Sequence, residues 1–173
     1  EAEEIIDTFC RRRKNIGGWI PPIKDIDKWW DTQTLDQLAA AHSLFEKTSI
    51  SSGAKNLLRI VFCRVLIESA SVSFRHQSMS FKKRDDCQKL FNVSAISRVK
   101  SLFKNIFREI ATTAGEHIPG AIPEAVLGDS RDLESVLPTN TYSAVITSPP
   151  YPNRMSYIRE LRPYMYWLGY LDD

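Results

Sequence analysis

The sequence predicts an α/β fold in which a mainly helical region, residues 1–119, precedes a shorter α/β segment, residues 120–173. The first observation behind this prediction is a series of long stretches with apolar residues at helical spacing before residue 120. The second is the change, after that point, to short apolar runs that end in turn residues. The resulting order of strand, helix, strand and helix is typical of a parallel sheet, which binds ligands at the carboxyl ends of its strands.

Four helices are expected in the first region. Residues 1–13 carry an apolar stripe, begin with acidic side chains and end with three arginines, an arrangement that suits the helix dipole. Two more helices are expected, one over residues 34–45 with Thr34 as its N-cap and one running to residue 66 with Ser51 or Ser52 as its N-cap. Ser94 is expected to cap a further long helix, which Gly115 can end.

The second region is expected to contain two short buried strands, residues 125–127 and 142–146, because each is an apolar run bounded by polar turn residues. A short helix is expected between them over residues 133–137, and a final amphipathic helix over residues 157–168. Polar residues directly follow each strand. The sequence therefore places its candidate sites at the carboxyl ends of two strands.

Composition limits the class of protein. Of the 173 residues, 43% are hydrophobic and 25% are charged, which is the balance of an ordinary globular domain. No apolar run approaches the roughly 18 residues of a membrane helix, and the acidic N-terminus lacks the pattern of a secretory signal. We therefore expect a soluble cytoplasmic protein without a membrane partner. The cysteines, Cys10, Cys63 and Cys87, have no zinc-binding spacing, so no metal is expected.

The net charge of +2 conceals a basic block. Residues 75–108 hold nine basic and two acidic side chains, a net charge of +7, whereas residues 109–173 have a net charge of −5. Phosphate backbones select basic blocks of this kind, although a solvated helix face gives the same count. Residues 74–84 break the helical period and mix cations with hydroxyls and amides, so they are expected to form an exposed loop that contacts phosphates.

The sequence Thr147-Ser148-Pro149-Pro150-Tyr151 directly follows the second predicted strand. Two consecutive prolines fix two φ angles and remove two N–H donors, so this stiff segment presents carbonyl oxygens outward. Together with the Ser148 hydroxyl these oxygens can accept hydrogen bonds from an amino group, while the Tyr151 ring can stack on a planar partner. A nucleobase with an exocyclic amine fits this description. A rigid turn with a packed tyrosine is the structural alternative.

Ser148-Pro149-Pro150-Tyr151 resembles the catalytic motif of the amino-group DNA methyltransferases, (Asp/Asn/Ser)-Pro-Pro-(Tyr/Phe/Trp). Its serine resembles the cytosine-N4 branch, with adenine-N6 as the close alternative. Gly128-Asp129-Ser130, and the run from Asn153 to Gly169, resemble the surroundings of this motif in bacterial members. The resemblance implies a partial Rossmann-like, S-adenosylmethionine-dependent methyltransferase sheet, preceded by a helical insertion.

The resemblance also implies roles for individual residues. Ser148 and the Pro149 carbonyl would accept hydrogen bonds from the amine of a flipped base, Pro150 would stiffen the segment, and Tyr151 would stack on the base. Asp129 would bind the adenine amine of S-adenosylmethionine, although a helix N-cap explains it equally well. DNA contacts are expected from Arg75, Lys82, Lys83, Arg84 and Arg154, with Arg98, Lys100, Lys104 and Arg108 as further candidates.

One motif of the family is missing. The sequence contains no Phe-x-Gly-x-Gly string, which holds the methionine part of the cofactor in these enzymes. The chain is therefore expected to be an internal piece of a methyltransferase, or one part of a split enzyme whose remainder is its partner. A non-catalytic nucleic-acid-binding helical module is the alternative of a different class. Methylation of a protein amide is a third class, but its Pro-Pro-Tyr motif usually follows asparagine rather than serine.

We predict that the 173-residue chain alone binds S-adenosylmethionine weakly or not at all, because it lacks this cofactor motif. Titration calorimetry measures the affinity directly. A micromolar dissociation constant for the chain alone would contradict the prediction.

Overall fold

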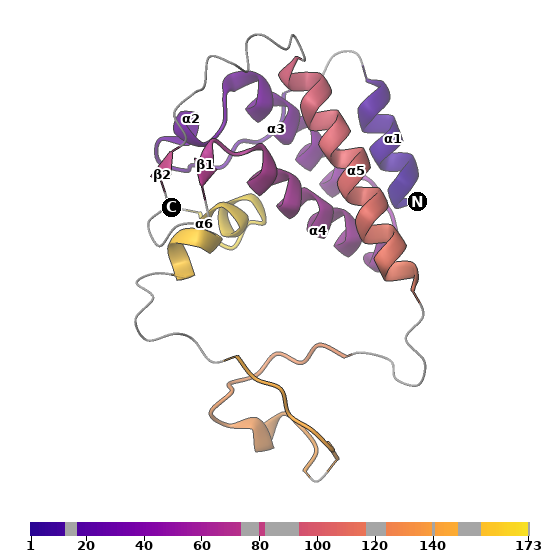
Figure 1. Ribbon diagram of the computed structural model, residues 1–173, viewed down its shortest axis with the longest axis vertical. Helices are drawn as coiled ribbons and strands as arrows, with labels where there is room; N and C mark the ends of the chain where they lie inside the picture. The colour runs from indigo at the N-terminus through magenta and orange to yellow at the C-terminus, as the bar shows by residue number, and fades with distance from the viewer. Residues whose placement is uncertain are drawn as a thin grey trace. The chain divides into compact units, whose positions relative to one another are not determined.

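The structure is a computed structural model that describes residues 1–12, 17–73, 80–81, 94–116, 124–139, 141–148 and 157–172. The chain divides into two compact units. The first, here called the helical unit, consists of residues 1–115 and 156–173, and the second unit consists of residues 116–155 (Figure 1). The predicted division into residues 1–119 and 120–173 remains a prediction.

The helical unit contains all of the α-helices in the described residues. They are α1 (Ala2–Arg11), α2 (Ile26–Trp29), α3 (Thr32–Lys47), α4 (Ser52–Ser69), α5 (Ala95–Gly115) and α6 (Tyr157–Trp167). Helix α6 belongs to this unit although residues 116–156 separate it from α5 in the sequence. The final helix of the chain therefore packs with the helices that precede the second unit.

Side-chain caps fix where the long helices begin. Ser51, one of the two serines expected as its cap, caps α4 by accepting a hydrogen bond from the Ala54 backbone N–H at 3.4 Å. Ser94 caps α5 in the same way, and α5 ends at Gly115 as expected. Helix α3 begins earlier than predicted, because the Asp31 carboxylate rather than Thr34 accepts from the first turn.

Helix α4 forms the centre of the hydrophobic core. It packs against both α3 and α5, and α1 packs on α5 as well (Figure 1). Phenylalanine rings from four helices meet there, at centroid separations of 5.1 to 6.3 Å and mostly edge to face. These rings are those of Phe9, Phe45, Phe62 and Phe103. The long apolar stripes in the sequence thus form one shared core.

The prediction of an α/β fold with a partial Rossmann-like sheet is wrong. The described residues are mainly helical. Their only strands, β1 (Val72–Ser73) and β2 (Ser80–Phe81), form a single antiparallel pair with Val72 opposite Phe81. Residues 125–127 and 142–146, predicted as buried strands, are exposed and adopt no regular secondary structure. A strand needs neighbours that pair its backbone and cover its apolar face, and the described residues supply none for these segments.

The second unit has little internal packing. Its described residues contain one short 3₁₀-helix, Leu133–Ser135, and none of their side chains is buried. Gly128 lies close to Val136, where an added Cβ would come within 2.8 Å of the valine side chain. The described part of this unit therefore lacks a hydrophobic core of its own.

In the described parts of the chain, no helix combines the length and the apolar character that crossing a bilayer requires.

We predict that Gly18→Ala destabilises the helical unit by about 1–3 kcal/mol, because an added Cβ would overlap the Ala39 carbonyl oxygen on α3. The overlap is with backbone, so no side-chain rotation relieves it. Chemical denaturation monitored by circular dichroism measures the loss. Gly17→Ala is the matched control, because no atom lies within 4 Å of its added Cβ. Equal stability of the two variants would refute the prediction.

Candidate functional site

Ser148 is the only residue of the predicted catalytic motif that the structure describes. It is exposed, at the end of the described segment 141–148, and its hydroxyl has no hydrogen-bond partner among the described residues. Pro149, Pro150 and Tyr151 lie outside the described residues. The predicted DNA-contacting residues Arg75, Lys82, Lys83, Arg84 and Arg154 also lie outside them.

Asp129 is engaged in a local turn. Its carboxylate accepts hydrogen bonds from the Arg131 backbone N–H at 2.9 Å and from the Arg131 guanidinium Nε at 3.0 Å. The side-chain hydrogen bond from Arg131 is the main cause that lowers the pKa of Asp129. The 3₁₀-helix that follows has Asp132 as its N-cap residue, so Asp129 does not take the capping position either. Its role in cofactor binding remains a prediction.

The described residues do not fit S-adenosylmethionine by themselves. Such a cofactor needs acceptors for its adenine amine, partners for its ribose hydroxyls and groups that hold its charged methionine end. Arg131 already engages both oxygens of Asp129. The pocket of about 350 Å³ in the second unit has a mainly apolar wall, to which Glu134 contributes the one charged side chain, and Asp129 is not part of it.

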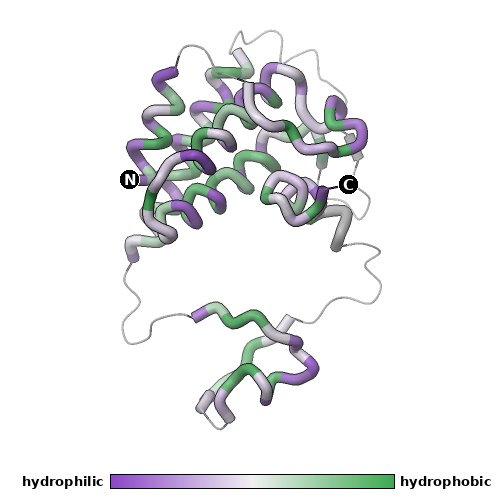
Figure 2. The backbone as a smooth tube through the Cα atoms, turned by 180° about the vertical axis from the view of Figure 1, so that it is seen from behind, coloured by the Kyte–Doolittle hydropathy of each residue, from purple (hydrophilic) through white to green (hydrophobic). Residues whose placement is uncertain are grey.

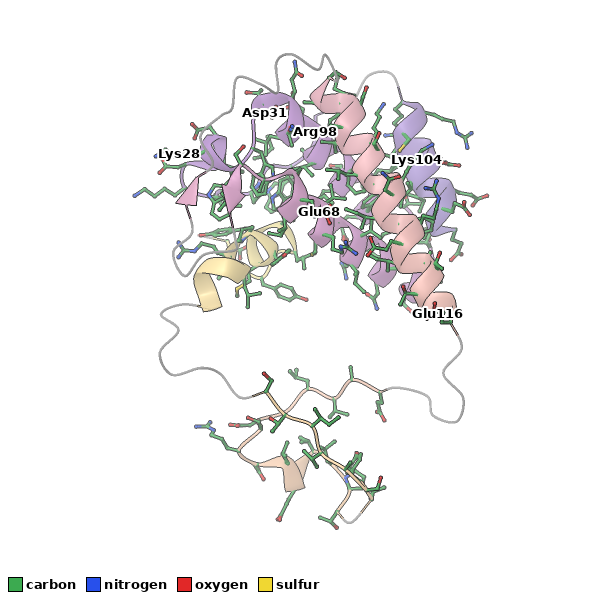
Figure 3. All side chains as sticks on the ribbon, viewed as in Figure 1. Lys28, Asp31, Glu68, Arg98, Lys104 and Glu116 are labelled. Carbon is green, nitrogen blue, oxygen red and sulfur yellow. The ribbon has the colours of Figure 1, made fainter. Side chains whose placement is uncertain are left out.

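Three of the four basic side chains predicted as further DNA contacts on α5 have partners within the helical unit. Lys100 donates to the Arg12 backbone carbonyl at 2.6 Å, and Lys104 Nζ lies 3.5 Å from an Asp7 carboxylate oxygen on α1. Arg98 lies 3.6 Å from the Asp31 carboxylate at the start of α3 (Figure 3). These cations link α5 to its neighbours, and the pairs are too exposed to contribute much stability individually.

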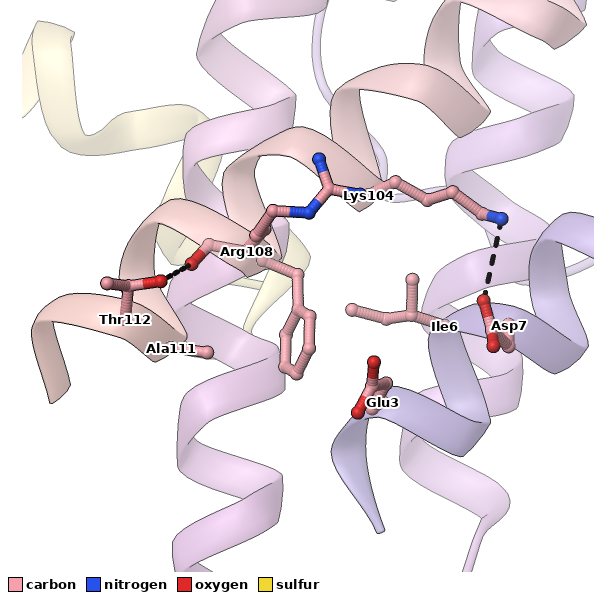
Figure 4. A pocket seen from close by; sticks show the side chains of 8 residues that line it. Glu3, Ile6, Asp7, Lys104, Arg108, Ala111 and Thr112 are labelled. Carbon is pink, nitrogen blue, oxygen red and sulfur yellow. Dashed lines mark hydrogen bonds and ion pairs between the residues drawn. The ribbon is translucent and has the colours of Figure 1, made fainter. Parts of the chain in front are cut away.

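Arg108 differs from these three cations. It forms no ion pair with any described residue, and it lines a pocket of about 380 Å³ between α1 and α5 (Figure 4). Glu3 and Asp7 on α1 face Lys104 and Arg108 on α5 across this pocket. Because both signs of charge share the wall, an ion of either sign meets opposing charges there. We assign this pocket no role in the function.

Helix α6, which follows the motif in the sequence, is held by Trp167. This side chain is 0% exposed, and its ring lies 5.4 Å from that of Phe62 and 6.3 Å from that of Trp30. The exposed edge of the same cluster includes Trp19, whose ring lies 6.1 Å from Trp167. The helical unit therefore fixes the chain shortly after the motif. This anchor was not predicted from the sequence, in which the three tryptophans between residues 19 and 30 are a signal of an aromatic cluster.

His42 lies in the same aromatic cluster. Its ring is 5.5 Å from Trp19 and 5.6 Å from both Phe62 and Trp167. Burial is the main cause that lowers its pKa below 6.5, opposed by the charge of Glu46 and by a hydrogen bond to the Trp167 backbone. The charges of Lys55 and Arg59 lower the pKa further. The His42 ring thus contributes to the packing of this cluster.

No group of three or more His, Cys, Asp or Glu side chains with metal-binding geometry occurs among the described residues. Comparison of the chain with models of known protein families, with curated proteins and with solved structures finds no match.

We predict that the helical unit loses stability as the pH falls below about 6.5, because the lowered pKa of His42 makes the unfolded chain bind a proton more readily. This contribution is complete above pH 6.5 and is lost as the pH falls through the pKa of the folded state. One proton gives a slope of at most about 1.4 kcal/mol per pH unit, and solvent at this half-buried ring reduces it.

Urea denaturation between pH 7.5 and 5.5 tests this, since carboxylates stay ionised over that range. The free energy of unfolding of His42→Gln should depend less on pH than that of the unmodified chain. Parallel pH profiles for the two proteins would show that His42 is not the group responsible.

Proposed function

We propose that this chain carries the amine-binding segment of a DNA amino-methyltransferase, which transfers a methyl group from S-adenosylmethionine to the exocyclic amine of a flipped base. Cytosine N4 is the favoured target because serine precedes the two prolines, and adenine N6 is the alternative. The observation that carries the proposal is Ser148, which begins the sequence Ser148-Pro149-Pro150-Tyr151 and has an exposed hydroxyl without a partner among the described residues.

The chemistry of this segment follows from its acceptors. The Ser148 hydroxyl and the Pro149 carbonyl accept hydrogen bonds from the target amine, which turns the nitrogen lone pair toward the methyl donor. The same acceptors stabilise the positive charge that develops on nitrogen during transfer. Pro150 limits the movement of the segment, and the Tyr151 ring stacks on the flipped base.

S-adenosylmethionine supplies the methyl group in this proposal. The described residues do not complete its site, so the proposal assigns the remaining contacts to residues outside the described ranges, in this chain or in its partner. Asp129 contributes only if its carboxylate leaves Arg131. The partner polypeptide is the remainder of a longer or split methyltransferase.

DNA contact is assigned to Arg75, Lys82, Lys83, Arg84 and Arg154. The cations of α5 are poorer candidates for DNA contact. Lys100, Lys104 and Arg98 on α5 already bind groups on neighbouring elements, so α5 offers fewer free cations than its sequence suggests. The same pairing weakens the alternative of a non-catalytic nucleic-acid-binding module, which would depend on that helix.

We predict that Ser148→Ala lowers kcat of the protein expressed from its complete reading frame by about 100-fold, because removal of one preorganised hydrogen-bonding group typically costs 10²–10³ in rate. Radiolabelled S-adenosylmethionine and duplex DNA measure the rate. Nucleoside mass spectrometry then distinguishes N4-methylcytosine from N6-methyladenine.

Ser143→Ala is the matched control, because Ser143 is an exposed serine of the same segment outside the motif. It should retain full activity. The proposal fails if the complete protein methylates no DNA under conditions in which it binds S-adenosylmethionine, or if Ser148→Ala and Ser143→Ala have equal rates.

A further inference from the structure

The second unit exposes two apolar runs. Leu127 is 100% exposed, Ile146 is 99% exposed and Val145 is 80% exposed. Figure 2 shows the runs as green segments of the second unit. Side chains of this kind are normally buried, and none of the described side chains of this unit is buried. Apolar runs exposed in this way are typical of protein surfaces that bind a partner.

The backbone of both runs also lacks a partner in the part of the chain that the structure describes. Among the described residues, no backbone hydrogen bond involves residues 124–128 or 142–148, and the two runs do not pair with each other. Valine, isoleucine, threonine and tyrosine dominate residues 141–147, a composition typical of strands. The runs therefore need a partner that offers backbone donors and acceptors as well as apolar side chains. An added polypeptide strand meets both needs at once.

Charge narrows the identity of that partner. Residues 124–148 contain four acidic side chains and one basic side chain, a net charge of −3. This charge opposes an anionic membrane surface and a second copy of the same segment. A partner strand with lysine or arginine at its ends complements it.

We propose that residues 124–127 and 142–147 form a strand-addition site for a different polypeptide, whose apolar strand is flanked by basic residues. The bound strand pairs with the backbone of these runs, and its side chains cover Leu127, Val145 and Ile146. The proposal concerns assembly and does not depend on methyl transfer.

The test uses the 173-residue chain and a fluorescein-labelled peptide of sequence Lys-Thr-Val-Ile-Val-Thr-Lys. Fluorescence anisotropy should show saturable binding that weakens at high salt. A peptide N-methylated at alternate residues keeps the side chains but loses backbone donors, so it should bind at least about tenfold more weakly. A third peptide with glutamate in place of both lysines should also bind more weakly.

Two substitutions in the chain locate the site. Ile146→Gln should weaken binding by about tenfold, since it removes a contact at an almost fully exposed position without disturbing the helical core. Ile60→Gln is the matched control, because Ile60 is an exposed isoleucine on α4. It should bind the peptide as the unmodified chain does.

Several outcomes would overturn the proposal. These are the absence of peptide binding, equal binding of the N-methylated peptide, and equal affinities of the Ile146→Gln and Ile60→Gln chains. Sedimentation of the chain alone as a dimer that Ile146→Gln dissociates would identify a second copy as the occupant instead. Binding to anionic vesicles or to duplex DNA that Ile146→Gln abolishes would assign the surface to those ligands.

Discussion

The burial of Trp167 among the aromatic side chains of the helical unit is the contact on which the arrangement of the chain depends. It returns α6 to the helices that precede the second unit. Burial of an indole ring is worth roughly 4–6 kcal/mol from its apolar area. The Trp167 Nε1 atom is buried without a partner in the described part of the chain, which costs about 1–3 kcal/mol. The gain exceeds the cost, so packing rather than hydrogen bonding holds α6 in place. Trp30 differs, because its Nε1 donates to the Leu66 carbonyl at 3.1 Å.

The helical part of the fold could be predicted from the sequence because its signals are local. Apolar spacing located α1, α3, α4 and α5, and the hydroxyls of Ser51 and Ser94 located two of their first turns. The predicted sheet failed for a physical reason. Residues 125–127 and 142–146 have the composition of strands, but composition does not provide the neighbouring strands that a sheet requires, and the described residues contain none for them. In the second unit, the local sequence pattern therefore predicts strands, whereas the described residues provide no neighbouring strand to pair with them.

The candidate site could be predicted only in part, since its partners are distant in sequence. The pairing of Lys104 with Asp7, and of Arg98 with Asp31, joins residues separated by more than 60 positions. A count of basic residues therefore overestimated the free positive charge of α5. Asp129, in contrast, has a partner that is close in the sequence. Arg131 is only two residues away, so this pairing could have been predicted. The motif that begins at Ser148 remains a sequence-based argument, to which the structure adds the exposure of the serine.

Both ends of residues 116–155 are attached to the same helical unit, so this segment forms a closed loop between α5 and α6. The entropy of closing a flexible loop grows only with the logarithm of its length, so that doubling the length costs about 0.6 kcal/mol. The helical unit can therefore accept a longer, shorter or entirely different segment between α5 and α6 at little cost to its own folding. Changes in the length of the segment between α5 and α6 are therefore constrained by the chemistry of residues 116–155 rather than by the folding of the helical unit.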